Sequence, residues 1–231
     1  MQKDPDNSYI KTILAHVDLT DASVLEIGCG DGRMTRDLAQ HARKVVATEL
    51  DAEVLERAKK SINTPNVSFL HTPDGLPDPA TGPFDLAIYT LSLHHIPAGR
   101  MLEHLQRSAG LLSPAGRIMV IEPGDGGAFM EIKQRYGAGS GDEGPEKNAA
   151  LRAMRSMPNW MMSETCSFEV IFLFTDANDF YMSKLPGYRT LPLETRQEIS
   201  AFLDRYTTTR GIELGSERRL NLLTRTGSDH R

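Results

Sequence analysis

Cysteine is scarce in this sequence, and its scarcity limits the classes of protein to which the chain can belong. Only Cys29 and Cys166 are present among 231 residues. Two cysteines are too few for the disulfide framework that holds small secreted domains together. We therefore expect a reducing, cytoplasmic setting. Histidine, cysteine and acidic residues also never cluster at metal-ligand spacing, so no metal site is predicted.

Long apolar runs are also missing. The longest stretch without a charged residue covers residues 86–99, which are 14 residues interrupted by Pro97. A membrane-spanning helix needs about 20 predominantly apolar residues, so no membrane span is predicted. The first residues, Met-Gln-Lys-Asp-Pro-Asp, lack the apolar centre of a secretion signal.

Neither sign of charge dominates the chain. There are 26 basic and 31 acidic residues, for a net charge of −5. A nucleic-acid-binding domain is usually clearly basic, so a small-molecule partner is the better expectation. The hydrophobic share of 39% excludes global disorder. The length fits one domain with additions.

The first half of the sequence alternates short apolar runs with amphipathic ones. Alternation of strands with helices of about ten residues predicts right-handed βαβ units and a parallel sheet, an α/β fold. Asp51 is expected to cap one of the helices. The expected strands are residues 24–27, 44–48, 66–70, 84–89 and 116–122, and the expected helices are 8–18, 31–41, 51–61 and 98–110.

Beyond residue 122 the pattern is less regular. Seven of the 19 glycines fall between positions 124 and 144, which predicts a loop over 124–147. Two further strands would complete a seven-stranded sheet in a single domain over 1–231, with lid insertions at about 123–164 and 176–210. The Arg218-Arg219 pair is expected at a strand edge. The remaining expected elements are helices over 145–157, 176–184 and 193–208 and strands over 165–175 and 218–226.

The strongest chemical signal is Val-Leu-Glu-Ile-Gly-Cys-Gly-Asp-Gly-Arg at positions 24–33. Gly28, Gly30 and Gly32 follow a buried strand and open a helix, so the backbone can turn tightly and approach a ligand. The spacing is G-x-G-x-G and not the G-x-G-x-x-G of dinucleotide binders. Glu26 precedes the first glycine by two residues, and it would repel a pyrophosphate and attract a cationic group.

Glu49 is the second signal. It ends the next expected strand, 17 residues after Gly32. A carboxylate at this place can accept hydrogen bonds from both hydroxyls of a ribose. The glycine loop and the carboxylate together predict a ligand that carries a ribose.

Residues 24–35, the strand end at Glu49 and the stretch Phe-Asp-Leu-Ala-Ile-Tyr-Thr-Leu-Ser-Leu-His-His-Ile-Pro at 84–97 together resemble class I S-adenosylmethionine-dependent methyltransferases. The closest similarity is to the small-molecule group that includes ubiquinone- and menaquinone-biosynthesis enzymes. This resemblance covers about residues 20–122 and implies a Rossmann-like, doubly wound, seven-stranded, mostly parallel sheet with an antiparallel last strand. It also implies that Glu49 binds the ribose and Leu50 packs on the adenine of S-adenosylmethionine. The residues implied to line the methionine part are Glu26, Gly28, Cys29, Gly30 and Gly32.

The expected adenine contact departs from the family pattern. An Asp followed by a small residue usually holds the adenine amino group, and that position aligns here with Thr72. Asp74 and Gly75 lie two residues further on. Thr72 and Asp74 are therefore alternatives, and we predict Asp74 with Gly75.

The acceptor side is expected in the loops after the fourth and fifth strands, because ligands of such sheets bind at the carboxyl ends of the strands. Thr90 and Leu91 should lie near the cofactor. His94 and His95 should lie near the acceptor, where a histidine can remove a proton or simply pack. Glu122 ends the fifth strand and is a further candidate base or polar anchor.

The predicted reaction is in-line transfer of a methyl group from S-adenosylmethionine to a small, partly apolar acceptor. One alternative is a non-catalytic module that binds the cofactor. The other is an NAD-dependent oxidoreductase, which the glycine spacing disfavours. A group of apolar residues would line an apolar acceptor pocket or pack in an ordinary core; they are Phe129, Met154, Met157, Trp160, Met161 and Met162.

Overall fold

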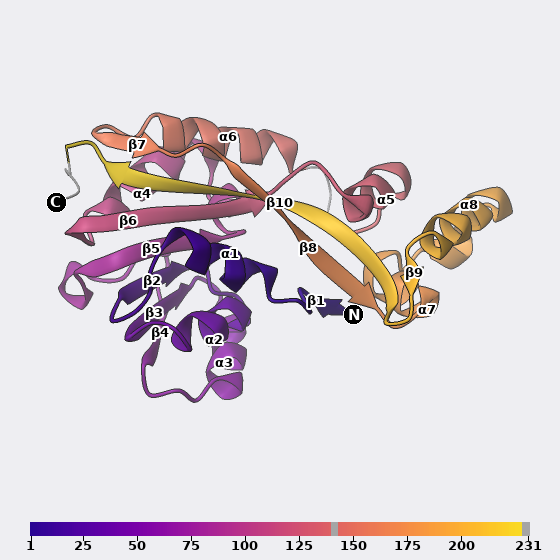
Figure 1. Cartoon of the computed structure of the whole chain (residues 1–231), viewed down its shortest axis with the longest axis horizontal. Helices are drawn as coiled ribbons and strands as arrows, with labels where there is room; N and C mark the ends of the chain where they lie inside the picture. Colours follow the sequence, from indigo (N-terminus) through magenta and orange to yellow (C-terminus); the bar gives the residue numbers. More distant parts are fainter. Residues whose placement is uncertain (140–142, 228–231) are drawn as a thin grey trace. The chain divides into compact units, whose positions relative to one another are not determined.

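The computed structural model describes residues 1–139 and 143–227 (Figure 1). The chain divides into two compact units, each built from interleaved segments. The glycine-loop unit contains residues 13–122, 143–166 and 219–227 of the described chain. The aromatic-core unit contains residues 1–12, 123–139 and 167–218. The two units are described separately below.

Five consecutive strands form the centre of the glycine-loop unit. The pairs β2–β3, β3–β4, β2–β5 and β5–β6 are all parallel. Every residue of β2 is buried, as expected for a strand covered on both faces. The strands are β2 (Ser23–Ile27), β3 (Lys44–Glu49), β4 (Val67–His71), β5 (Phe84–Thr90) and β6 (Leu112–Pro123).

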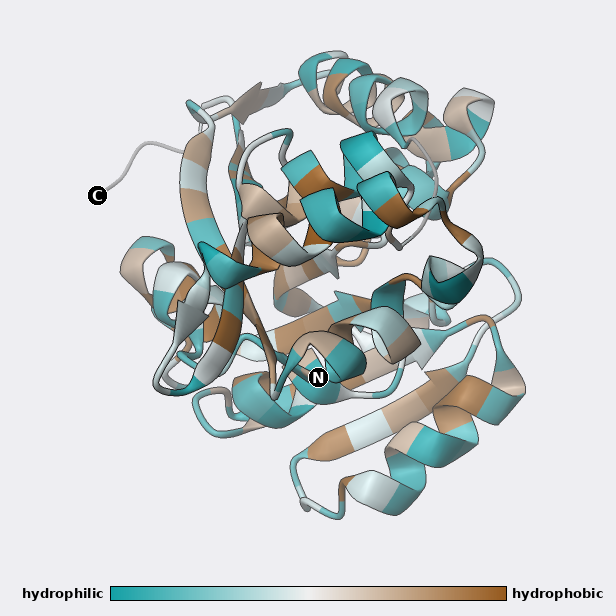
Figure 2. Ribbon diagram, turned by 90° about the vertical axis from the view of Figure 1, so that its right-hand side faces the viewer, coloured by the Kyte–Doolittle hydropathy of each residue, from teal (hydrophilic) through white to brown (hydrophobic). Residues whose placement is uncertain are grey.

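Helices cover both faces of this sheet. Leu25 of β2 shares a core cluster with Leu105 and Ala150, which lie on α4 and α6. Ala47 of β3 packs instead with Leu55 of α3. Figure 2 shows brown hydrophobic segments along the strands and mixed colours on the helices. The helices are α1 (Ser8–His16), which begins in the other unit, α2 (Arg33–Ala39), α3 (Ala52–Ser61), α4 (Met101–Ala109) and α6 (Gly144–Arg155).

The helix starts follow local chemistry. Asp51 caps α3, because its side chain accepts hydrogen bonds from the backbone N–H groups of Glu53 and Val54 at 2.8 and 3.1 Å. This prediction is confirmed. The helix after the glycine loop begins at Arg33 and not at the expected residue 31, because Gly32 has a left-handed backbone with φ of +81°. Short 3₁₀ turns are η1 (Pro79–Thr81), η2 (Leu93–His95) and η3 (Ala98–Arg100).

The strand order is β1-β8-β10-β6-β5-β2-β3-β4. It contains all seven expected strands, and the arrows of β6 and β10 point in opposite directions in Figure 1. The expected doubly wound sheet with an antiparallel last strand is thus confirmed. The added strands are short: β1 (Gln2–Lys3), β7 (Trp160–Met162) and β9 (Thr207–Thr208), of which the last two pair with β10 (Gly211–Arg225).

The aromatic-core unit packs helices around most of β8 and the first part of β10. The expected loop over 124–147 is wrong in part, because α5 forms there between Gly127 and the left-handed Gly137, whose φ is +71°. The core of the aromatic-core unit contains Phe129, Ile132, Phe172, Phe174, Phe180, Ile199, Phe202, Leu203, Ile212 and Leu214 among others. The elements are β8 (Cys166–Phe174), α5 (Ala128–Tyr136), α7 (Ala177–Lys184), η4 (Tyr188–Thr190) and α8 (Leu193–Asp204).

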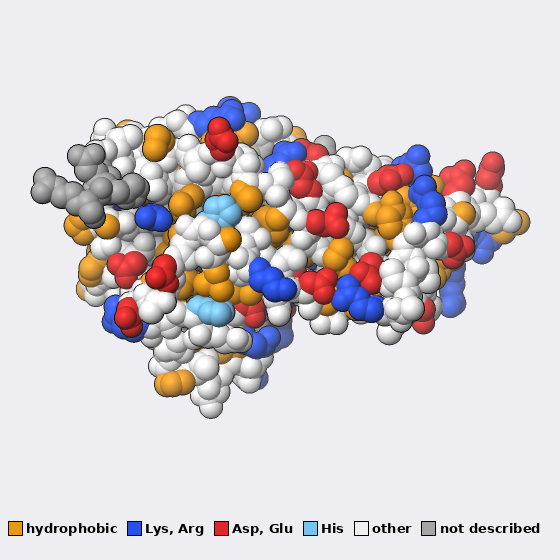
Figure 3. Space-filling model, in the orientation of Figure 1, with side chains coloured by type: hydrophobic (Ala, Val, Ile, Leu, Met, Phe, Trp, Pro, Cys, Tyr) orange, Lys and Arg blue, Asp and Glu red, His pale blue; other side chains and the backbone are white. Residues whose placement is uncertain are grey.

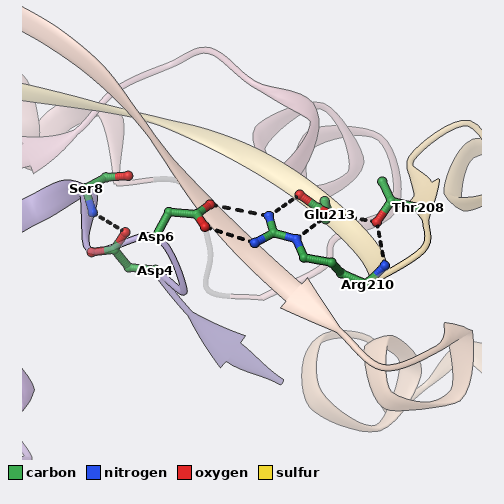
Figure 4. A network of polar contacts seen from close by, with 6 residues as sticks. All are labelled: Asp4, Asp6, Ser8, Thr208, Arg210 and Glu213. Carbon is green, nitrogen blue, oxygen red and sulfur yellow. Dashed lines mark hydrogen bonds and ion pairs between the residues drawn. The ribbon is translucent and has the colours of Figure 1, made fainter.

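An arginine fastens the N-terminal segment to β10 within this unit (Figure 4). Arg210 donates to the carboxylate of Asp6 at 2.9 Å and to that of Glu213 at 2.7 Å. The Arg210 side chain is 46% exposed, so water screens this network and each exposed pair contributes little stability.

The surface carries mixed charge. On the face drawn in Figure 3, basic and acidic side chains are interspersed. Across residues 1–139 and 143–227, no helix combines the length and the apolar character that crossing a membrane requires.

Candidate functional site

The glycine loop follows β2 and is held by β3. The backbone N–H groups of Gly28 and Cys29 donate to the carbonyl of Thr48 at 3.0 and 2.9 Å. A side chain added at Gly28 would approach Ser92 Cβ to 2.8 Å, and one added at Gly32 would approach Ile62 Cδ1 to 2.6 Å. A side chain added at Gly30 would meet no atom within 4 Å. The outer two glycines are therefore required by packing, whereas Gly30 borders open space.

Glu49 lies against this loop. Its carboxylate accepts hydrogen bonds from the backbone N–H groups of Gly30 at 2.8 Å, Leu50 at 2.8 Å and Asp51 at 3.1 Å. A carboxylate has about four lone-pair sites, so three amides leave room for one more donor. The neighbouring side chain of Leu50 is 56% exposed, which is unusual for a leucine and leaves an apolar surface beside the carboxylate.

Glu26 is buried on the face of β2 that α2 covers. The hydroxyl of Thr35 donates to its carboxylate at 2.6 Å. Burial raises the pKa of Glu26 to about 8, because desolvation outweighs the hydrogen bond from Thr35. Burial, and next the charge of Glu26, also raise the pKa of the Cys29 thiol. Cys29 is thus a small buried residue and not an activated nucleophile.

The loop after β4 contains both candidates for the adenine contact. The carboxylate of Asp74 forms an ion pair with Arg107 Nη2 at 2.5 Å, which lowers the pKa of Asp74. Thr72 is 8% exposed, and its hydroxyl has no hydrogen-bond partner within residues 1–139 and 143–227. Gly75 has a φ of +82°, and its carbonyl accepts the Thr48 hydroxyl at 2.7 Å. Among the described residues the buried Thr72 hydroxyl is therefore unpartnered, whereas Asp74 is paired with Arg107.

The end of β5 has an irregular backbone. Leu91 has a φ of +58°, which is costly for a residue with a side chain and is often found at functional sites. The preceding residue, Thr90, has a buried hydroxyl that finds no partner in the described part of the chain. Ser92 donates to the carbonyl of Ile27 at 2.6 Å, so this segment is joined to the end of β2.

His94 and Glu122 come together at the ends of β5 and β6. Both side chains are almost fully buried. The ring Nδ1 of His94 contacts Glu122 Oε2, and the backbone N–H of His94 donates to Glu122 Oε1 at 3.2 Å. An ionised carboxylate can only accept, so Nδ1 is the donor in the contact with such a carboxylate.

His95 is exposed and its ring lies 4.0 Å from that of His94, centroid to centroid. Desolvation, and next the neighbouring His94, lower the pKa of His95. Glu122 forms hydrogen bonds with His94, and none between Glu122 and His95 is found among the described residues. The structure thus distinguishes two residues that the sequence left equivalent.

All of the predicted site residues fall in the glycine-loop unit. The recorded contacts join Gly30 with Glu49 and His94 with Glu122. Asp74 is directed to Arg107 and is not in contact with either pair. The described residues contain no group of three or more His, Cys, Asp or Glu side chains that could hold a metal ion.

Three supporting residues were not found from the sequence. Thr35 binds Glu26, and Ser92 binds the end of β2. His104 connects Tyr89 OH, at 2.9 Å from its Nδ1, with the carbonyl of Asp74, at 2.9 Å from its Nε2. In the sequence, the role of His104 is indicated only by its position on the apolar face of a helix. Ordinary core residues occupy such positions too, so the position does not distinguish His104 from them.

The expected apolar wall does not form as one surface. Met154 and Met157 are buried in the core of the glycine-loop unit, with Trp160 and Met162 packed against it. Met161 is 62% exposed. Phe129 belongs to the other unit, where it stacks on Phe172 with a centroid separation of 4.5 Å. Ordinary core packing, the second of the two expectations, accounts for most of these residues.

The residues present fit a nucleoside ligand with a cationic part. The open space at Gly30, the exposed Leu50 and the unpartnered hydroxyls of Thr72 and Thr90 offer apolar and polar contacts. Glu26 and Glu49 supply the acidic groups. This combination of acidic, hydroxyl and apolar groups suits a ribose and a positively charged centre better than a pyrophosphate.

Known proteins with similar sequences are methyltransferases. The methyltransferase domain family matches residues 24–116. An uncharacterized methyltransferase of Mycobacterium tuberculosis is 34% identical over 113 residues, which are 49% of this chain and 56% of that protein. A ubiquinone biosynthesis O-methyltransferase of Xanthomonas oryzae is 28% identical over 111 residues, 47% of this chain and 46% of that protein. The matched part spans about half the length of these relatives.

Similarity of fold extends further than similarity of sequence. A protein of Anaeromyxobacter dehalogenans, provisionally assigned as a type II methyltransferase, superimposes with a TM-score of 0.63. The alignment covers 97% of this chain and 98% of that one at 16% identity. Residues 24–116, which include the glycine loop and Glu49, thus match the methyltransferase domain family, and the chain has the fold of the Anaeromyxobacter dehalogenans protein.

Proposed function

We propose that this protein transfers a methyl group from S-adenosylmethionine to a small-molecule acceptor. The observation that carries the proposal is the hydrogen bond between Gly30 and Glu49. It brings the glycine loop and the ribose-binding carboxylate into one site beside the exposed Leu50. When bound, S-adenosylmethionine supplies a methyl group that its sulfonium makes electrophilic. The protein then contributes mainly position and alignment.

The cofactor contacts follow from the groups left available. Glu49 accepts the ribose hydroxyls with its remaining lone pair or in exchange for the Gly30 amide. Leu50 packs on the adenine, and Thr72 contacts it with its unpartnered hydroxyl, in preference to Asp74. Gly28, Cys29, Gly30 and Gly32 border the methionine part, and Gly75, Thr90 and Leu91 complete the surroundings.

Glu26 responds to a cation. Its raised pKa keeps the carboxyl group largely neutral at pH 7. A positive charge nearby favours the ionised form and lowers that pKa. Binding of a cationic ligand is therefore expected to release a proton from Glu26, which offsets the cost of burying the charge.

His94 is the proposed base. Glu122 holds Nδ1 and stabilises the imidazolium that forms when Nε2 accepts a proton, the arrangement used by buried carboxylate–histidine pairs in catalysis. A base is required when the acceptor is a hydroxyl group, and much less when it is a carboxylate. The pair therefore supports a hydroxyl-bearing acceptor. His95 remains beside it as a neutral partner.

Calorimetry tests the proposal directly. S-adenosylmethionine and S-adenosylhomocysteine are expected to bind with dissociation constants in the micromolar range, a range of about −8 kcal/mol, and NADH is expected not to bind. Absence of binding for both sulfur ligands would overturn the proposal. Binding without methyl transfer to any of a panel of phenols, alcohols and amines would favour a non-catalytic cofactor-binding module.

A further inference from the structure

Arg218 lies inside the aromatic-core unit. It is a residue of β10 and only 5% exposed. β10 lies between β8 and β6 in the strand order, so the expected place at a strand edge is wrong. Arginine is almost never fully buried without a partner of opposite charge, so its surroundings need an explanation.

The hydrogen bonds of its guanidinium leave one nitrogen unused. Nε donates to Tyr9 OH at 2.5 Å. Nη1 donates to Ser216 Oγ at 2.8 Å and to the carbonyl of Glu217 at 2.7 Å. A guanidinium has five N–H groups, and these three bonds leave both hydrogens of Nη2. Among the described residues no acceptor is recorded for Nη2.

The charge of Arg218 is also uncompensated. All three of its hydrogen-bond acceptors are neutral, and no ion pair is recorded for it within residues 1–139 and 143–227. Arg210, near the start of the same strand, is 46% exposed and yet contacts two carboxylates (Figure 4). The ion pairs thus lie where water already screens the charge, and the buried arginine has none.

Arg218 is thus a largely buried cation without an ion-pair partner among the described residues, and such a group can bind an anion. The surroundings add two features. Arg218 lies over the rings of Tyr9 and Phe172, at 5.9 and 5.6 Å from their centroids. Lys184 Nζ lies 5.7 Å from the centroid of the same Phe172 ring, and burial followed by the charges of Lys3 and Lys133 lowers its pKa. Arg218 and Lys184 thus both lie near the ring of Phe172.

We propose that Arg218 is the anion-binding group of a ligand site in the aromatic-core unit, and that its ligand is a small organic carboxylate. The two hydrogens of Nη2 donate to the carboxylate oxygens, and the rings of Tyr9 and Phe172 contact the apolar part of the molecule. A monoanion neutralises the single charge of Arg218. The proposal concerns binding alone and does not depend on the proposed methyl transfer.

The test measures binding of benzoate to the full chain, without S-adenosylmethionine, by thermal shift and calorimetry. Benzoate should raise the melting temperature in a saturable manner, and the neutral benzamide should not. Arg218→Met should weaken benzoate binding at least tenfold, while Arg210→Met, the control immediately before the same strand, should bind benzoate as the wild type does. If Arg218→Met does not fold, Arg218→Lys replaces it, because lysine keeps the charge and lacks Nη2; the same loss is expected.

Three outcomes would overturn the proposal. Stabilisation by inorganic phosphate but not by benzoate would show that the ligand is another oxyanion and not a carboxylate. Equal binding of benzoate by the wild type and by the Arg218 variant would place the anion elsewhere. No binding of either anion by the wild type would make Arg218 a purely structural residue.

Discussion

The two units assemble their polar chemistry over very different distances along the chain. In the glycine-loop unit the central contact joins Gly30 and Glu49, which are 19 positions apart. In the aromatic-core unit the Arg218–Tyr9 hydrogen bond joins residues 209 positions apart. The first contact lies within one strand–helix–strand repeat and follows from the motif. The second depends on how β10 meets the N-terminal segment, which no local pattern encodes.

The largest expected effect tests the buried pair of the glycine-loop unit. His94→Gln should lower the rate of methyl transfer to a hydroxyl acceptor by about 10²–10⁴, the usual contribution of a general base. The measurement is release of S-adenosylhomocysteine during turnover, with cofactor affinity measured in parallel. His95→Gln is the matched control and should change the rate much less. Similar losses in the two variants would contradict the assignment of the base to His94.

A second prediction concerns Glu49 and sharpens the contrast between the units. Glu49→Gln should weaken binding of S-adenosylmethionine more than tenfold, because hydrogen bonds to a charged group contribute about 1.5–3 kcal/mol. Glu53→Gln, an exposed change in the first turn of α3, is the control. Benzoate binding at Arg218 should be the same in both variants. Calorimetry with each ligand checks this, and an unchanged cofactor affinity in Glu49→Gln would count against the ribose contact.

A third prediction uses the pH dependence of stability. The pKa of Glu26 is raised from 4.5 to about 8 in the folded protein. Between these values the folded state binds more protons than the unfolded state, so the contribution of Glu26 to the free energy of unfolding falls as pH rises from about 4.5 to about 8. Glu26→Gln should remove this slope. Urea unfolding at several pH values, without cofactor, measures this slope. The same pH dependence of the free energy of unfolding in the wild type and in Glu26→Gln would disprove the pKa shift.

The smallest expected effect separates the two candidates for the adenine contact. Thr72→Val removes a buried hydroxyl without a partner, so the ligand-free protein should not lose stability. Cofactor affinity should fall about fivefold, equivalent to roughly 1 kcal/mol for a neutral hydrogen bond. Asp74→Asn should alter affinity less than twofold, because the Asp74–Arg107 pair is exposed and weak. The reverse order of effects would restore Asp74 as the contact.

Much of the fold could be predicted because the first five strands and their helices follow one another in order. Each strand is an apolar run and each helix has its own amphipathic pattern, so local sequence is enough. The helix α5 was not predicted because the many glycines around it indicated a loop. Its ends are in fact marked by Gly127 and Gly137, so glycine bounds the helix here and does not extend the loop.

At the site, residue types and order specified the glycine loop, Glu49 and the histidine pair. The acidity and the bonding partner of each of these groups, however, depend on its surroundings in the folded protein. Burial makes Glu26 a weak acid, Arg107 engages Asp74, and Glu122 selects His94 over its neighbour. These are effects of desolvation and of contacts between separate strands, and a linear pattern carries neither.

The sequence was sufficient to predict the parallel strands of the glycine-loop unit and the similarity of residues 24–116 to methyltransferase domains, because these arise from contacts between neighbouring elements. Tertiary structure decided which side chains are buried, which carboxylates are already paired and where Arg218 lies. The physical reason is that a charge in water costs little wherever it stands in the chain. The free-energy cost of a charge in the folded protein, and therefore the role that it can have, depends on the groups that the fold places around it.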